Sequence, residues 1–140
     1  MEPGVSQGPL INADAVAKVE EHIANALSLG ASVVTGGARH PLGGNFFQPT
    51  VLTEVPKTAR AMNEEPFGPL AMINPVGSFD EMVEEANRLP YGLAAYAFTR
   101  SQRTATALAS EVETGMLTIN HLGLALPEVP FGGVKDSGYG

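Results

Sequence analysis

The run LAAYAFT at Leu93–Thr99 is almost wholly apolar and lies between two segments with the pattern of amphipathic helices, Ser78–Arg88 and Ser101–Glu111. Continuous apolar runs are typical of strands that are covered on both faces of a parallel sheet. Further strands are expected at Leu70–Val76 and Met116–Asn120. The order strand, helix, strand, helix, strand indicates a parallel sheet with right-handed crossovers. The predicted fold class is α/β, a three-layer αβα arrangement with a mostly parallel sheet.

The first half of the chain adds one helix and two extended segments. Apolar residues at helical spacing predict a helix that begins after an N-cap at Asn12, runs to Leu29 and is closed by Gly30. A short β-branched strand is expected at Ala31–Thr35. Extended chain is expected again at Phe46–Thr53, where an internal proline restricts it to an edge or divides it.

Length and composition indicate one globular domain over residues 1–140. The chain has 140 residues, of which 44% are apolar and 16% charged. A chain of this length buries roughly 68% of its unfolded surface, which is enough for a sizeable core. Its composition is not that of a disordered chain, and it contains no internal repeat of fixed period.

The charge of the chain argues against several classes of partner. The formal net charge is −7, with only eight Lys and Arg residues against fifteen Asp and Glu. Nucleic acids and anionic membranes are bound by clustered basic residues, so neither is an expected partner. No apolar run approaches 18 residues and no basic-then-apolar leader is present, so the expected compartment is the cytoplasm.

A stiff segment, MNEEPFGPL at Met62–Leu70, is the best candidate for a binding site. Its two prolines fix their own φ angles and bias the preceding residues towards extended geometry. A rigid loop of this kind holds a carboxylate and an aromatic ring where a ligand needs them. Adjacent residues in extended chain point to opposite sides, so at most one of Glu64 and Glu65 faces a site.

Five motifs in one order resemble the NAD(P)-dependent aldehyde dehydrogenase superfamily, and together they span nearly the whole chain. They are QGPLI at Gln7–Ile11, NFFQPTV at Asn45–Val51, EEPFGP at Glu64–Pro69, Asn87 with YGLAAYAFT at Tyr91–Thr99, and PFGGVKDSGYG at Pro130–Gly140. The chain is similar to the C-terminal part of the catalytic domain, and most similar to the succinate-semialdehyde dehydrogenase-like members. The resemblance implies oxidation of an aldehyde to a carboxylic acid with NAD or NADP.

The resemblance also implies roles for particular residues. In the family the second glutamate of the motif, here Glu65, reaches the nicotinamide-side ribose, and the phenylalanine, here Phe67, lies beside the ring. An ionised carboxylate accepts hydrogen bonds from both ribose hydroxyls, which explains the residue type. The segment from His121 onward lines the aldehyde tunnel in the family, with Phe131 as the tunnel aromatic and Leu122 and Leu124 in its wall.

The family's nucleophilic cysteine and general-base glutamate lie upstream of the matched region. The chain contains no cysteine, and it ends at Gly140, where the family continues with an Arg-Glu pair and a strand used in dimer pairing. We therefore expect a domain truncated at both ends, without catalytic residues of its own, whose parent is a homo-oligomer. We also expect the isolated chain to be inactive and to self-associate through Phe46-Phe47 and Leu122–Leu126.

Simpler interpretations of these residues remain open. Glu65 is also consistent with a solvent-facing loop carboxylate, and Phe67 and Phe131 with core aromatics. Asn120, at the end of an apolar strand, is expected to complete backbone hydrogen bonds. The three histidines are far apart in sequence and lack acidic companions at ligand spacing, so no metal site is predicted. The glycine-rich tail lacks the Gly-Lys-Ser/Thr junction of a phosphate-binding loop.

A second class of function competes with the enzyme fragment. The same residues are compatible with a non-catalytic α/β binding or interaction module, which would keep the sheet but perform no chemistry. The run LGLALPEV at Leu122–Val129 bears on the substrate, because it resembles the tunnel segment of the semialdehyde enzymes but contains no Arg to hold a distal carboxylate.

Overall fold

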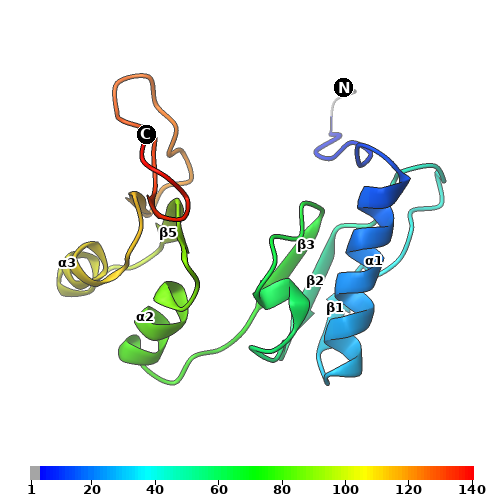
Figure 1. Cartoon of the computed structure of the whole chain (residues 1–140), viewed down its shortest axis with the longest axis horizontal. Coiled ribbons are helices and arrows are strands. Elements are labelled where there is room, and N and C mark those ends of the chain that lie inside the picture. Colours follow the sequence, from blue (N-terminus) through cyan, green and yellow to red (C-terminus); the bar gives the residue numbers. More distant parts are fainter. Residues whose placement is uncertain (1–3) are drawn as a thin grey trace. The chain divides into compact units, whose positions relative to one another are not determined.

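Helix α1 (Ala13–Ser28) organises the first half of the chain in the computed structural model, which describes residues 4–140 (Figure 1). It begins where the Asn12 side chain accepts a hydrogen bond from the Ala15 amide at 2.9 Å. It ends at the C-cap Leu29, after which Gly30 takes a φ of +106°. These boundaries confirm the helix that the sequence predicts.

A three-stranded sheet packs against α1. Its strands are β1 (Ser32–Thr35), β2 (Thr50–Thr53) and β3 (Leu70–Ile73), in the order β1-β2-β3. Strand β2 is antiparallel to β1, with an irregularity in the register, and parallel to β3. A short 3-10 helix, η1 (Arg60–Met62), stands between β2 and β3. The prediction of extended chain at Phe46–Thr53 is confirmed only for its second half, after the proline.

The main hydrophobic core lies between α1 and this sheet. Its buried residues are Val16, Val19, Ile23, Ala26, Ala31, Phe47, Leu52, Val55 and Ala59. Phe47 is only 2% exposed. The prediction that Phe46-Phe47 forms a surface for self-association is therefore wrong for Phe47. The physical reason is that Phe47 packs among the core residues, beside an antiparallel β-bridge that its backbone forms with Arg39.

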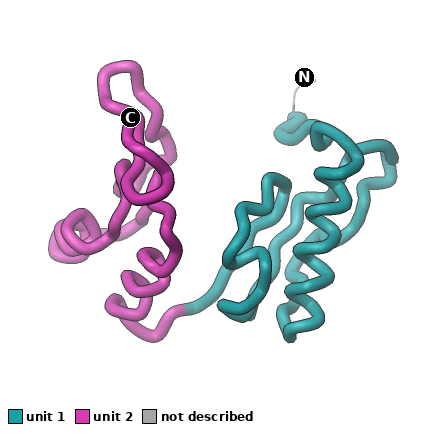
Figure 2. The backbone as a smooth tube through the Cα atoms, viewed as in Figure 1, with its two compact units in different colours: residues 1–75 teal, residues 76–140 magenta. Residues whose placement is uncertain are grey.

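The chain folds into two compact units, one ending at Pro75 and the other running from Val76 to Gly140 (Figure 2). The elements of the second unit are α2 (Phe79–Asn87), β4 (Tyr91–Gly92), β5 (Ala94–Ala97), α3 (Gln102–Glu111), β6 (Met116–Ile119) and β7 (Val134–Lys135). Ser78 and Ser101 cap the two helices by accepting from the amides of Glu81 and Thr104. Both helices begin where the sequence predicts them.

The strand pairing confirms an α/β protein with parallel strands but differs from the predicted single sheet. Strands β5 and β6 are parallel, β4 and β7 are antiparallel, and β3 pairs with β2 in the first unit. The order of elements in the sequence instead predicts that the strands at Leu70, Leu93 and Met116 form one sheet. Strands that follow each other in sequence are neighbours only about two-thirds of the time, so their order alone does not determine the pairing.

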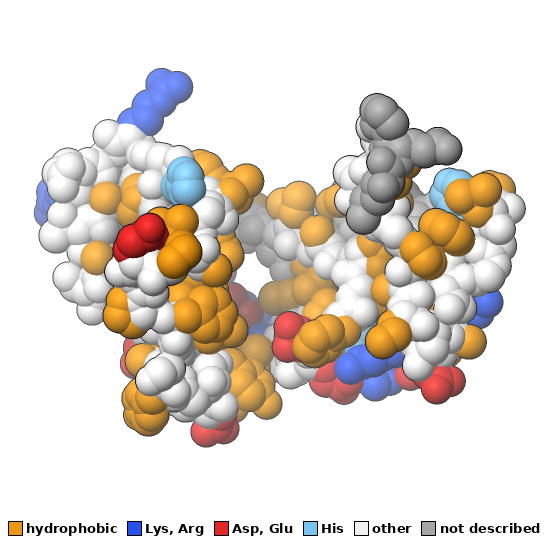
Figure 3. Space-filling model, turned by 90° about the horizontal axis from the view of Figure 1, so that it is seen from above, with side chains coloured by type: hydrophobic (Ala, Val, Ile, Leu, Met, Phe, Trp, Pro, Cys, Tyr) orange, Lys and Arg blue, Asp and Glu red, His pale blue; other side chains and the backbone are white. Residues whose placement is uncertain are grey.

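The second unit leaves many large apolar side chains uncovered. Strand β5 alternates between exposed and half-buried residues, so it is not covered on both faces as its apolar run predicts. Tyr96, Phe98, Leu122 and Phe131 are all at least half exposed. Figure 3 shows hydrophobic side chains gathered on the surface of this unit, in the left half of the picture. Apolar patches of this kind usually mark a surface that a partner or another part of a protein covers.

Within the described residues, no helix combines the length and the apolar character that a membrane span requires.

Candidate functional site

The loop that carries both acidic candidates runs from residue 63 to residue 69, between η1 and β3, and is called the carboxylate loop below. Its first residue is held by two side-chain hydrogen bonds, from Asn63 Nδ2 to the carbonyls of Lys57 and Ala59, both 2.8 Å. Its last residue is held by the sheet, because the Pro69 carbonyl accepts from the Thr50 amide at 2.8 Å. Both ends of the loop are therefore fixed to the core of the first unit.

The C-terminal end of the carboxylate loop lies directly on α1. A Cβ atom added to Gly68 would collide with the side chain of Val19, a fully buried residue of that helix. Only glycine therefore lets the backbone approach this closely. The preceding residue, Phe67, has a φ of +27° and a side chain that leaves the residue 72% exposed. A bulky residue with positive φ and an exposed ring is uncommon, and such residues cluster at ligand sites.

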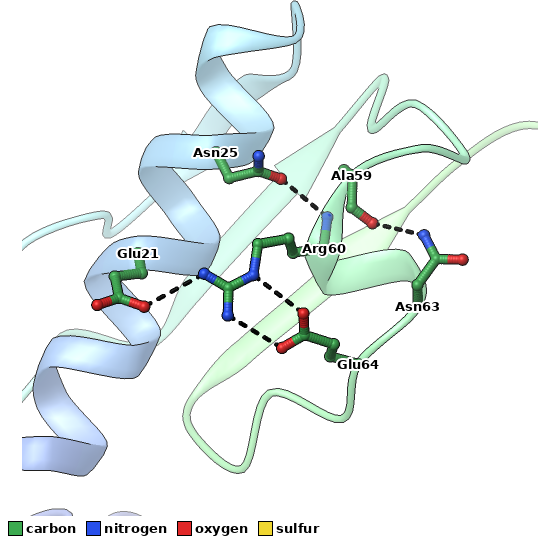
Figure 4. Close-up of polar contacts among 6 residues, drawn as sticks. All are labelled: Glu21, Asn25, Ala59, Arg60, Asn63 and Glu64. Carbon is green, nitrogen blue, oxygen red and sulfur yellow. Dashed lines mark hydrogen bonds and ion pairs between the residues drawn. The ribbon is translucent and has the colours of Figure 1, made fainter.

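The two glutamates of the loop have different surroundings (Figure 4). Glu64 accepts from Arg60 Nε at 3.0 Å and Nη2 at 3.1 Å, and the Arg60 guanidinium lowers the pKa of the Glu64 carboxyl. Glu65 is exposed, and its carboxylate makes no hydrogen bond or ion pair within the part of the chain that the structure describes. The prediction that at most one of the pair faces a site is consistent with this division, in which Glu65 is available to a ligand.

The tunnel candidates belong to the second unit and stand on irregular chain. Leu122 and Phe131 are 74% and 56% exposed, and Leu124 is half-buried. The segment between β6 and β7 turns back on itself at His121, whose Nδ1 lies 2.9 Å from both the amide and the carbonyl of Gly123. These candidates therefore share one segment, while Glu65 and Phe67 share the carboxylate loop of the other unit.

The glycine-rich tail that follows Phe131 is pinned to the end of α2. Lys135, in the left-handed region with a φ of +55°, donates from Nζ to the carbonyls of Asn87 and Leu89 at 3.0 and 3.2 Å. Its ammonium also forms an ion pair with Glu113. Together with the β4–β7 pairing, these interactions hold the tail against β4 and the end of α2. The sequence predicts no strand at β7.

Asn120 takes the structural role that the sequence predicts. Its side chain accepts from the Thr99 amide and donates to the Thr99 carbonyl, both at 2.8 Å, so it joins the ends of β5 and β6. Its φ of +58° lies in the left-handed region, which asparagine tolerates better than most residues. Phe98, Thr99, Arg100 and Asn120 line an open hollow of about 500 Å³ at this edge of the parallel pair.

The sequence alone assigned no role to three further side chains, Arg60, Lys135 and His22. Arg60 and Lys135 are ordinary basic residues in sequence, and their partners are recognised only when distant segments are brought together. His22 lies on the buried face of α1 with no exposed surface, and neither of its ring nitrogens has a hydrogen-bond partner among the described residues. Helical spacing places His22 on the apolar face, but its lack of partners is a tertiary feature. In the described range 4–140 no three His, Cys, Asp or Glu side chains are grouped to hold a metal ion.

Comparison with known proteins defines the class of this α/β chain. The family model described as "Aldehyde dehydrogenase family" matches residues 1–140. The chain belongs to the aldehyde dehydrogenase family. Among curated relatives it is 49% identical over 140 residues to 3-sulfolactaldehyde dehydrogenase of Pseudomonas putida and 50% identical over 141 residues to glutarate-semialdehyde dehydrogenase of Pseudomonas aeruginosa. Each match covers 100% of this chain and 29% of the relative.

Solved structures agree with these sequence relatives. The succinate-semialdehyde dehydrogenase of Burkholderia pseudomallei superposes with a TM-score of 0.94 at 48% identity, over 99% of this chain and 29% of that one. The succinic semialdehyde dehydrogenase of Streptococcus pyogenes, solved with NADP+ as the cofactor, gives 0.90 at 41% identity, over 100% and 31% of the two chains. The chain thus spans less than a third of the length of the relatives that it matches.

Proposed function

We propose that this chain is the C-terminal part of the catalytic domain of an NAD(P)-dependent aldehyde dehydrogenase, called the parent enzyme below, which oxidises an aldehyde to a carboxylic acid. The observation that carries the proposal is the carboxylate loop. From a backbone fixed at both ends it presents the exposed ring of Phe67 and the carboxylate of Glu65, to which the described part of the chain offers no partner. Family membership and an NADP+ complex of one solved relative support it.

The side chains of the carboxylate loop fit the cofactor that this function requires. A ribose offers two hydroxyl donors, and the Glu65 carboxylate has acceptor positions for both. The exposed face of Phe67 is suited to pack beside a flat ring. When bound, a nicotinamide cofactor would supply the acceptor for the hydride removed from the aldehyde. In the parent enzyme this chain would bind the ribose through Glu65. It would also form part of the tunnel wall through Leu122, Leu124 and Phe131.

The substrate that we propose is an aldehyde with an acidic group at its other end. The names of the relatives refer to 3-sulfolactaldehyde, glutarate semialdehyde and succinate semialdehyde, each of which carries a sulfonate or a carboxylate. The segment Leu122–Val129 is mostly apolar, includes one acidic residue, Glu128, and contains no Lys or Arg. A cation that binds the acidic group would therefore come from elsewhere in the parent enzyme. We also propose, from the family resemblance, that the parent is a cytoplasmic homo-oligomer, which fractionation and sedimentation would test.

The decisive experiment on the cofactor site is Glu65→Gln in the parent enzyme. The amide keeps the shape of the side chain but loses the charge and one acceptor, so the ribose is held less accurately. Small errors of position reduce rates by up to about 10²-fold, and we expect single-turnover NAD(P)H formation to slow more than cofactor binding weakens. Glu84→Gln, which removes an exposed carboxylate on α2, is the matched control. Equal single-turnover rates for Glu65→Gln, Glu84→Gln and the unmodified enzyme would refute the assignment.

The experiment on the substrate is a comparison of matched aldehydes. Succinate and glutarate semialdehydes should give higher kcat/KM values than butanal and pentanal, which have the same chain lengths but no acidic group. A preference for the uncharged aldehydes would refute the proposed substrate class. Absence of turnover with every aldehyde and both cofactors would instead favour the non-catalytic binding module.

A further inference from the structure

We infer that Arg60 is a positioning residue, which holds Glu64 away from the ligand and so determines that Glu65 and Phe67 face it. The inference rests on the proposed function and assigns part of the cofactor site to a residue outside its motif. Arg60 lies on η1, directly before the carboxylate loop, and contacts both that loop and α1 (Figure 4). Neither its charge nor its place in the sequence marks it as part of a site.

The contacts of Arg60 tie the start of the carboxylate loop to α1. Its guanidinium binds both oxygens of Glu64, at 3.0 and 3.1 Å, and its third nitrogen donates to Glu21 of α1 at 3.2 Å. Its backbone amide donates to Asn25 Oδ1, also on α1, at 2.8 Å. The Glu64 amide in turn donates to the Arg60 carbonyl at 2.7 Å. One residue thus fixes both the backbone and the side chain of Glu64.

The other side of the loop is fixed to the same helix, where Gly68 lies against Val19. Only Glu65, Pro66 and Phe67 stand between the two anchors, and the proline ring fixes the central φ angle. Pro66 also biases Glu65, the residue before it, towards extended geometry. The Glu64 carboxylate is bound by Arg60 whereas Glu65 is exposed, and a shift at Arg60 would be passed to Glu65 and Phe67 over very few bonds.

If Arg60 had a purely structural role, its replacement should have little effect on either rate or stability, because exposed ion pairs stabilise proteins only weakly. The chain offers a matched comparison on the same helix. Arg39 Nε and Nη2 bind both oxygens of Glu20 on α1 at 2.8 Å, with side chains about as exposed as those of the Arg60 pair. Arg39 lies outside the carboxylate loop. If Arg60 is only another surface ion pair, its loss should resemble the loss of Arg39.

The test compares Arg60→Met, Arg60→Lys and Arg39→Met in the parent enzyme. We expect Arg60→Met to slow single-turnover NAD(P)H formation about threefold to tenfold, less than the roughly 10²-fold limit for direct misplacement, because it acts through Glu64. Arg60→Lys should recover part of the rate, since an ammonium keeps the charge but cannot form the bidentate pair. Arg39→Met should leave the rate unchanged, while both Met variants show similarly small shifts of melting temperature.

A double variant separates positioning from other effects. Because Arg60 is inferred to place Glu65 as well as Phe67, Arg60→Met should cause a smaller fold loss of rate in the Glu65→Gln background than in the unmodified enzyme. Multiplicative losses in the double variant would overturn the inference, as would a rate for Arg60→Met equal to that of Arg39→Met. Failure of the proposed function is a different result, since Glu65→Gln would then match the unmodified enzyme whatever Arg60→Met does.

Discussion

Replacing His22 with leucine should stabilise the first unit, increasingly so as the pH falls. The imidazole is completely buried, and neither nitrogen has a hydrogen-bond partner within residues 4–140. Burial lowers its pKa from the ordinary 6.5, with smaller contributions from the carboxylates of Glu64 and Glu21, which raise it, and from the cations of Arg60 and Lys18, which lower it. The folded protein therefore holds a neutral His22 at neutral pH.

The direction of the pH dependence follows from the lowered pKa. Below about pH 6.5 the unfolded chain binds a proton at this histidine more readily than the folded chain does. The free energy of unfolding therefore keeps its full value above that pH and decreases as the pH falls below it. The loss is at most about 1.4 kcal/mol per pH unit for one group. His22→Leu removes this dependence. It also removes an unpaired buried polar group, which costs about 1–3 kcal/mol when left without a partner.

Hydrogen exchange of peptides from α1 is the suitable assay, since it reports the free energy of local opening. We expect His22→Leu to raise that energy by about 1 kcal/mol at pH 7.5, and the difference from wild type to widen below pH 6.5. His40→Gln is the control, because His40 belongs to the same unit but accepts a hydrogen bond from the Leu42 amide. Parallel pH profiles for wild type and His22→Leu would show that His22 does not contribute to the pH dependence of stability.

Three further predictions concern the isolated chain. It should produce no NADH from any aldehyde, because it contains no thiolate to attack the carbonyl; turnover by rigorously purified chain would contradict this. It should self-associate or unfold easily, since Leu122 and Leu126 are exposed at 74% and 51%; a strictly monomeric species in light scattering over a concentration series, with no binding of a hydrophobic dye, would argue the opposite. Gly36→Ala should reduce the free energy of unfolding by clearly more than Gly43→Ala. Both glycines have a positive φ, +73° and +71°, where a side chain costs about 1–2 kcal/mol, but only at Gly36 would a Cβ collide with the Pro49 carbonyl. Equal losses in urea titrations would show that the collision is relieved without cost.

Local sequence predicted the helices well, because their ends are chosen by side chains that act within one turn. Asn12, Ser78 and Ser101 each accept a hydrogen bond from an amide three residues later, as their residue types indicate. The carboxylate loop was recognisable for a similar reason, since its prolines and Gly68 restrict the backbone wherever they occur. Glu65 and Phe67 were candidates because of a motif, and their roles stay predictions.

Contacts between residues that are distant in the chain could not be predicted from the sequence and became visible only in the folded protein. Whether Glu64 or Glu65 is paired depends on Arg60 and on Glu21, which lies 39 residues before Arg60 on another element. Whether an aromatic side chain is exposed or buried depends on which residues pack over it. Phe47 and Phe131 therefore differ in exposure although both belong to family motifs. The family, the helix ends and the stiff loop could be predicted from the sequence, because they follow from residue type and local geometry. The pairing of the strands, the burial of His22 and the anchoring of Glu64 required the fold, because contact energies depend on distances in space that sequence order does not specify.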